Sequence, residues 1–191
     1  MSNGTANHAH DSVRTALLVI DLQTALLAEE PMPRDIDGVL ARINALAERA
    51  RARGAPVILI QHEEPHPALI YGSVGWQLDA RVQTRPSDLR LRKRTVDSFL
   101  DTPLESWLVE RNVTQVVICG FASEFCVDTT SRRAAALGYN VIVASDAHTT
   151  QDRPDFPAEK IRDHHTATLT SINTFRGKIE ARVAGELFTE W

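Results

Sequence analysis

The sequence predicts an α/β fold: a doubly wound, mostly parallel sheet with helices on both faces. Two observations lead to this prediction. Continuous apolar runs of strand length, such as TALLVID at 15–21 and NVIVASD at 140–146, are typical of strands buried on both faces. These runs alternate with stretches of roughly 10 to 18 residues that have helical periodicity, which is the pattern of βαβ units.

The first half of the chain contains two predicted helices and two more predicted strands. Residues 35–53 have apolar side chains at helical spacing, and Gly54 ends the pattern. The apolar run 55–61 is a buried strand, and a loop rich in Gly and Pro separates it from strand 88–94. Thr102 and Pro103 are a good N-cap and first helical residue, so a helix is predicted from there to about residue 111.

The second half repeats the same two patterns. Its predicted elements are strand 114–120, a helix from about 126 to 137, strand 140–146, a helix at about 158–171 and a short strand near 179–183.

Length and composition predict one domain with an ordinary globular balance. Residues 1–13 are polar and are expected to be a disordered tail, and residues 14–191 to form the domain. A net charge of −4 argues against nucleic acid as a partner. No apolar run approaches the ~20 residues that span a membrane. With two cysteines and no export signal, the expected location is cytoplasmic.

Residues with reactive side chains fall where predicted strands end. In parallel sheets the ligand crevice lies outside the carboxyl ends of the strands, so these residues should converge there. They are Asp21, His62, Lys93, Cys126 and Asp146.

Cys126 is the candidate nucleophile, because it follows a strand and a sharp turn and opens a predicted helix. Unpaired N–H groups and the helix dipole at such a position favour the thiolate, which predicts a lowered thiol pKa. Two alternatives stay open. The thiol could be a buried structural residue, or it could form a redox pair with Cys119.

Asp21 and Lys93 are the candidate partners of the thiol. Asp21 ends an apolar strand and could accept the thiol proton, although such an Asp also serves as a loop-entry residue. Lys93 shares a strand face with Leu89 and Leu91, which makes it less readily a solvated surface lysine. A buried ammonium there would lower the thiol pKa and hold the carboxylate ionised.

Three separated motifs lie around these residues: VIDLQ at Asp21, KRTVDSFLDTPL at Lys93 and GFASEFCVDTT at Cys126. The pattern AAALGYNVIVASDA follows the third. In type and order they resemble the isochorismatase-like cysteine hydrolases, a family that includes nicotinamidases and N-carbamoylsarcosine amidohydrolases. The resemblance runs from about residue 16 to at least residue 170.

The resemblance implies an Asp21–Lys93–Cys126 triad in which the Cys attacks a carbonyl and the Asp moves the proton. It also implies a non-proline cis peptide at Phe121–Ala122, with the N–H groups of Ala122 and Cys126 as an oxyanion hole. The function expected is cleavage of a C–N bond in a small amide or lactam through a thioester. The alternatives are an isochorismatase-type vinyl-ether hydrolase and a non-catalytic binding or redox-sensing protein of the same fold.

No metal and no cofactor are expected. Nicotinamidases bind a metal through an Asp-x-His…His motif after the second strand, whereas this chain has Gln61 and Glu63 where the Asp and the first His would stand. His62 and His66 lack an accompanying Asp. His164 and His165 are adjacent in a predicted helix, so their rings should point to different faces.

The segments GSVGWQLD (72–79) and DAHTT (146–150) resemble a subgroup that includes enzymes acting on the lactam of streptothricin-type antibiotics. For Trp76 and Phe125, core packing is an equal alternative to pocket lining. By family resemblance a homodimer or homotetramer is expected, and the long aromatic loop at 62–87 would be an interface or a lid. The candidate substrate-binding residues are Gln23, His62, Tyr71, Trp76, Phe125 and His148.

Overall fold

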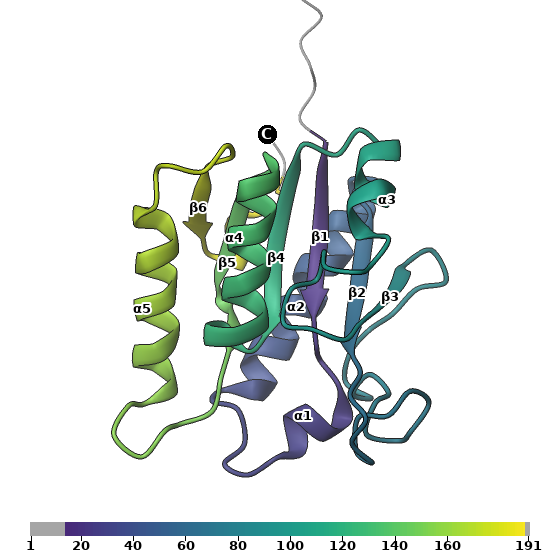
Figure 1. Ribbon diagram of the computed structural model, residues 1–191, viewed down its shortest axis with the longest axis vertical. Helices are drawn as coiled ribbons and strands as arrows, with labels where there is room; N and C mark the ends of the chain where they lie inside the picture. The colour runs from purple at the N-terminus through teal and green to yellow at the C-terminus, as the bar shows by residue number, and fades with distance from the viewer. Residues whose placement is uncertain (1–13, 190–191) are drawn as a thin grey trace, which may run out of the picture.

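Six parallel strands form one sheet in the computed structural model, which describes residues 14–189. The spatial order is β3-β2-β1-β4-β5-β6, so the chain starts in the middle of the sheet and winds outward in both directions (Figure 1). The predicted α/β fold with a parallel sheet is confirmed. The strands are β1 (Thr15–Ile20), β2 (Val57–His62), β3 (Leu89–Lys93), β4 (Gln115–Phe121), β5 (Asn140–Thr149) and β6 (Ile179–Arg182).

Helices cover both faces of the sheet (Figure 1). The long helix α2 packs on one face, and α3, α4 and α5 pack on the other. A short helix α1, which the sequence pattern did not predict, follows β1. The helices are α1 (Thr24–Ala28), α2 (Ile36–Ala52), α3 (Leu104–Glu110), α4 (Asp128–Leu137) and α5 (Ala158–Ser171), with a 3₁₀ turn at Ala184–Glu186.

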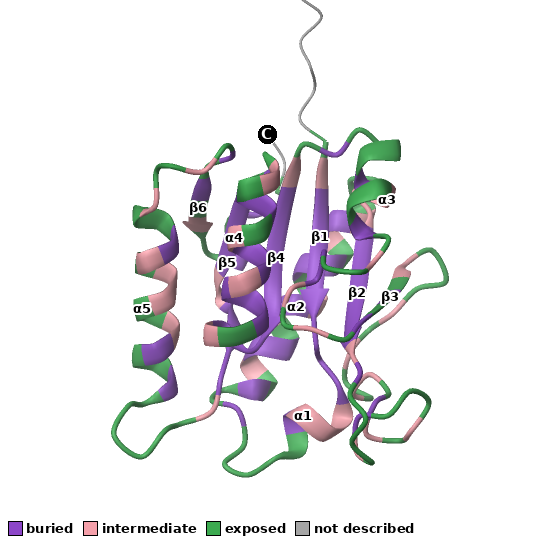
Figure 2. Cartoon of the chain, viewed as in Figure 1, coloured by how far each residue is buried: buried purple, intermediate pink, exposed green. Residues whose placement is uncertain are grey.

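The alternation of side chains along the central strands divides the core into two layers. Leu17 and Val19 of β1 pack with α2, whereas Leu18 and Ile20 join the cluster under α3, α4 and α5. Because both faces are covered, the central strands are apolar at almost every position and buried (Figure 2). This arrangement explains why continuous apolar runs, and not alternating ones, marked the strands.

The end of β5 differs from the sequence prediction, and the pairing of β5 with β4 is irregular. Strand β5 continues to Thr149, three residues beyond the predicted end, and its register with β4 shifts between Ile118 and Gly120. Gly120 has φ 120°, and an added Cβ there would lie 2.2 Å from the carbonyl oxygen of Ile20 in β1. Only glycine therefore lets β4 approach β1 this closely before the chain turns.

The segment between β2 and β3 is a long irregular loop, as predicted, and an isolated bridge between Gln23 and Leu78 ties it to the chain after β1. The predicted tail at residues 1–13 lies outside the described residues. Within residues 14–189 no helix is long and apolar enough to cross a membrane. The cytoplasmic location stays a prediction.

Candidate active site

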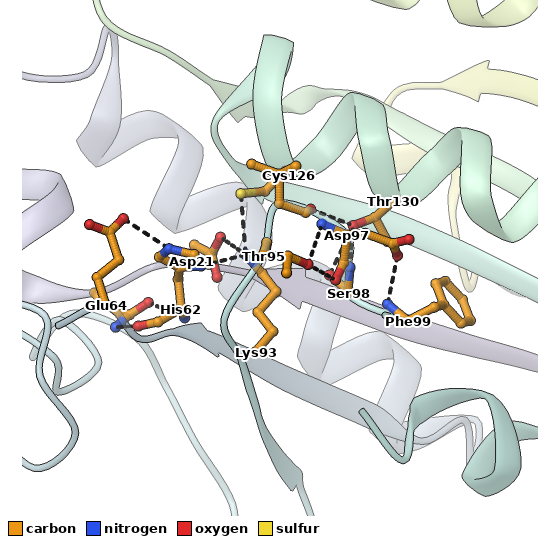
Figure 3. A network of polar contacts seen from close by, with 12 residues as sticks. Asp21, His62, Glu64, Lys93, Thr95, Asp97, Ser98, Phe99, Cys126 and Thr130 are labelled. Carbon is orange, nitrogen blue, oxygen red and sulfur yellow. Dashed lines mark hydrogen bonds and ion pairs between the residues drawn. The ribbon is translucent and has the colours of Figure 1, made fainter. Parts of the chain in front are cut away.

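Four neighbouring strands deliver polar side chains to one edge of the sheet. Asp21 follows β1, His62 ends β2, Lys93 ends β3, and Cys126 lies in the turn after β4. Figure 3 shows the first three beside the thiol, joined by polar contacts. The convergence expected from parallel strand ends is therefore present for these four residues. Asp146, which was also expected there, lies within β5, and its carboxylate instead accepts from the Ala184 N–H and lies near Arg42.

Asp21 and Lys93 form a buried ion pair. The Lys93 Nζ lies 2.6 Å from Asp21 Oδ2, and the two residues are 2% and 1% exposed. Burial alone would lower the pKa of Lys93, but the negative charge of Asp21, together with the contact to Cys126, outweighs it and leaves that pKa raised. The lysine is therefore an ammonium at neutral pH.

The backbone at Asp21 is left-handed, with φ 52°. Asp tolerates this region better than most residues, and such conformations cluster at functional sites. The turn aims the carboxylate at Lys93. Its second oxygen, Oδ1, is buried and has no hydrogen-bond partner among the described residues, so it remains free to accept a proton.

Cys126 Sγ lies 3.2 Å from Lys93 Nζ, and the residue is 9% exposed. Burial and the Asp21 charge raise the pKa of the Cys126 thiol more than Lys93 lowers it. The prediction of a lowered thiol pKa is wrong for the resting protein, because sequence reasoning counted the ammonium and the helix start but not the desolvation. The resting thiol is therefore neutral, and it would need a base to act as a nucleophile.

The turn that carries the thiol is π-helical (Ser123–Val127), and the α-helix begins only at Asp128. Cys126 therefore does not open an α-helix, contrary to the sequence prediction. The Phe121–Ala122 peptide bond before the turn is cis. The Ala122 carbonyl accepts hydrogen bonds from the N–H groups of Phe125 and Val127, at 3.1 and 3.2 Å, which holds the turn closed.

Two residues near Lys93 were not predicted from the sequence. The carbonyl of Thr95 accepts a hydrogen bond from Lys93 Nζ at 3.1 Å. Glu64 lies 2.9 Å from His62 Nε2, while His62 Nδ1 lies 3.3 Å from Lys93 Nζ (Figure 3). Glu64 stands in a loop with no periodic pattern, so no sequence signal could have found it.

Of the other predicted pocket residues, some are buried beneath the site and some are exposed at the surface. Gln23 is fully buried; its amide donates to the carbonyls of His62 and Trp76 and accepts from the His62 N–H. Trp76 is also buried, with the edge of its ring against Tyr71. Tyr71 and Phe125 are 60% and 48% exposed, so they are the aromatic residues available to a ligand.

His148 is buried behind the thiol turn. Its ring contacts Ser123 Oγ at 2.8 Å and Thr166 Oγ1 at 3.1 Å. Burial, with smaller effects of Arg162 and His165, lowers the pKa of His148 to about 3. The ring is therefore neutral at physiological pH, and it supports the turn that holds Cys126 from the side of α5.

The histidines that the sequence analysis weighed as metal ligands make other contacts. Both ring nitrogens of His62 are engaged, by Lys93 and by Glu64. The rings of His164 and His165 are nearly perpendicular, and His165 Nδ1 contacts Asp128. In the described part of the chain, His, Cys, Asp and Glu form no group of three or more that could hold a metal ion.

Residues 15–175 match the Isochorismatase domain family. A streptothricin hydrolase from Streptomyces noursei is 38% identical over 82% of this chain, and the match spans 62% of that relative's length. The ureidoacrylate amidohydrolase RutB of Methylobacterium radiotolerans is 29% identical, over 93% of this chain and 80% of its own. A crystal structure of an isochorismatase family protein superposes with a TM-score of 0.80 at 32% identity, covering 88% of this chain and 98% of that one.

Proposed function

The chain belongs to the isochorismatase family of hydrolases, and from that premise we infer that it cleaves a C–N bond of a small amide or lactam through a Cys126 thioester. The observation that carries the proposal is the buried contact of a thiol, an ammonium and a carboxylate, with Lys93 Nζ 3.2 Å from Cys126 Sγ and 2.6 Å from Asp21 Oδ2. The relatives named as streptothricin hydrolase and ureidoacrylate amidohydrolase support this class of bond.

Acylation needs a base, because the resting thiol is neutral. Asp21 takes the thiol proton on its unpartnered oxygen, and the thiolate attacks the carbonyl carbon of the substrate. As the C–N bond breaks, Asp21 returns the proton to the leaving nitrogen. The product of this half-reaction is an acyl thioester on Cys126 and a free amine, and the carboxylate is ionised again.

Deacylation also uses Asp21 to transfer a proton. Asp21 takes a proton from water, whose oxygen adds to the thioester carbon, and the C–S bond breaks to give a carboxylic acid. The proton then goes back to Cys126, so the enzyme ends as it began. Lys93 stays charged throughout. It lies beside the ionised Asp21 carboxylate in the resting enzyme and in the acyl-enzyme, and beside the thiolate before attack and after the C–S bond breaks.

The carbonyl oxygen gains negative charge in both half-reactions and needs hydrogen-bond donors. The N–H groups of Ala122 and Cys126 are our candidates, because Ala122 caps the π-helical turn that contains Cys126. Substrate contacts are assigned to the exposed aromatic rings of Phe125, in this turn, and Tyr71, in the loop after β2.

A substrate panel with Cys126 variants tests the proposal. Wild-type protein is offered primary amides, lactams including streptothricin, and isochorismate, and Cys126→Ala and Cys119→Ser are compared with it. We expect hydrolysis of an amide or lactam that Cys126→Ala abolishes and Cys119→Ser preserves, since Cys119 is fully buried. Consumption of isochorismate alone, retained in Cys126→Ala, would indicate the vinyl-ether alternative. No turnover, with a reversible Cys119–Cys126 disulfide, would indicate a redox sensor.

A further inference from the structure

The ammonium of Lys93 has more acceptors around it than it has protons to give. An ammonium carries three N–H donors and no acceptor. Four acceptors surround Nζ: Asp21 Oδ2 at 2.6 Å, the Thr95 carbonyl at 3.1 Å, Cys126 Sγ at 3.2 Å and His62 Nδ1 at 3.3 Å. The carboxylate and the carbonyl oxygen are the two nearest and the strongest acceptors, so each takes one proton. The sulfur and the imidazole must share the third.

The contact with Lys93 fixes the tautomer of His62. Because an ammonium can only donate, Nδ1 must present its lone pair, and the ring proton of neutral His62 must sit on Nε2. That proton points at Glu64 Oε1, 2.9 Å away. Glu64 therefore holds the ring in the one tautomer that can accept from Lys93.

The backbone holds the two side chains side by side. His62 and Lys93 are register partners in the adjacent parallel strands β2 and β3. The His62 N–H donates to Gln23 Oε1 at 2.7 Å, which ties the end of β2 to the chain after Asp21. The sheet therefore brings the imidazole beside the ammonium, and the contact with Glu64 orients the ring.

We propose that His62, oriented by Glu64, is a positioning residue that competes with the Cys126 sulfur for the third N–H of Lys93. A neutral thiol is a weak acceptor, so in the resting protein the N–H faces the imidazole. When the thiol proton moves to Asp21, the thiolate becomes the stronger acceptor and draws the N–H to itself. His62 thereby keeps the Cys126 thiol unreactive until Asp21 accepts the thiol proton. The catalytic use of this exchange rests on the proposed function, whereas the exchange itself does not.

The test measures the reactivity of Cys126 and needs no substrate. Iodoacetamide alkylation is followed at fixed pH by mass spectrometry of the peptide that carries Cys126. His62→Phe keeps a ring of similar size but removes the acceptor. We expect Cys126 in this variant to be alkylated roughly five-fold faster, the effect of one net hydrogen bond, with the rate profile shifted to lower pH.

Two further variants separate hydrogen bonding from access. His62→Asn places an amide oxygen near the position of Nδ1 and should return the rate to the wild-type value, although its smaller side chain opens more space. His66 is an exposed histidine in the loop after β2 without contact to Lys93, so His66→Leu should leave the alkylation rate unchanged. Alkylation of the Phe variant at the wild-type rate, or of the Asn variant at the Phe rate, would overturn the proposal.

Glu64→Ala keeps the test decisive if a His62 variant fails to fold, because this side chain is half exposed and its loss removes no core contact. Without Glu64 the ring also populates the other tautomer, so an alkylation rate between wild type and His62→Phe is expected. A rate equal to wild type would contradict the role of Glu64. If alkylation follows these expectations while no amide or lactam is hydrolysed, the proposed function fails and the positioning role stands.

Discussion

His148 makes the stability of the protein depend on pH in a way that can be calculated. Its ring is buried between Ser123 and Thr166, and its pKa is lowered to about 3 from an ordinary value near 6.5. The folded protein therefore disfavours the charged ring. As the pH falls below 6.5, the unfolded chain takes up a proton at this position before the folded chain does, and the free energy of unfolding decreases.

The magnitude follows from the two pKa values. One unit of pKa difference corresponds to about 1.4 kcal/mol. Between pH 7 and pH 4.5 the unfolded ring titrates almost fully and the folded ring hardly at all, so this one histidine removes about 3 kcal/mol of stability. That is a large part of the 5–15 kcal/mol typical of a domain.

Urea unfolding followed by circular dichroism, at pH 7 and at pH 4.5, measures the effect. His148→Asn retains a partner for Ser123 but carries no titratable ring, so its loss of stability between the two pH values should be about 3 kcal/mol smaller than that of the wild type. His66→Asn, at an exposed position, should behave like the wild type. Equal losses in wild type and His148→Asn would refute the burial of a neutral ring.

Three further predictions concern the backbone, the ion pair and assembly. Gly120→Ala should cost about 3 kcal/mol or more of unfolding free energy, because φ is 120° and the new Cβ would lie 2.2 Å from a β1 carbonyl; Gly185→Ala, with nothing within 4 Å, is the control, and equal melting curves would contradict the argument. Lys93→Met should lower the free energy of unfolding by about 3–5 kcal/mol, because it leaves the buried Asp21 charge unpaired. Adding Asp21→Asn should restore part of this loss, and a double variant no more stable than Lys93→Met would contradict the role of the ion pair. Light scattering should give a multiple of 21.2 kDa, and a mass near 21.2 kDa would make the loop after β2 a lid and not an interface.

The sequence predicted the positions of Asp21 and Cys126 because each follows a strand whose apolar run is clear, whereas Lys93 ends a strand in which leucines alternate with arginines. The carboxyl ends of parallel strands share one edge of the sheet, so strand prediction and residue type were enough to bring these three side chains together. The face of Lys93 followed from alternation with Leu91 in the same strand.

Properties that depend on burial in the folded protein could not be predicted from the sequence. The raised thiol pKa of Cys126 comes from desolvation by side chains distant in the chain, and the inward position of His148 depends on α5 packing behind β5. The π-helical turn has no compositional signature that separates it from the start of an α-helix. The contact of His62 with Glu64 depends on the conformation of the loop after β2, and loops have no sequence periodicity from which a contact could be predicted.

Strand β3 lies at the edge of the sheet, is five residues long and pairs with β2 alone. Edge elements with few neighbours open locally at a lower free energy than the strands at the centre. Since this strand carries Lys93, the stability of the candidate active site is set by an edge strand and not by the whole domain. In rising denaturant the ammonium should leave the site while the central strands are still paired, so the chemistry should fail before the fold does.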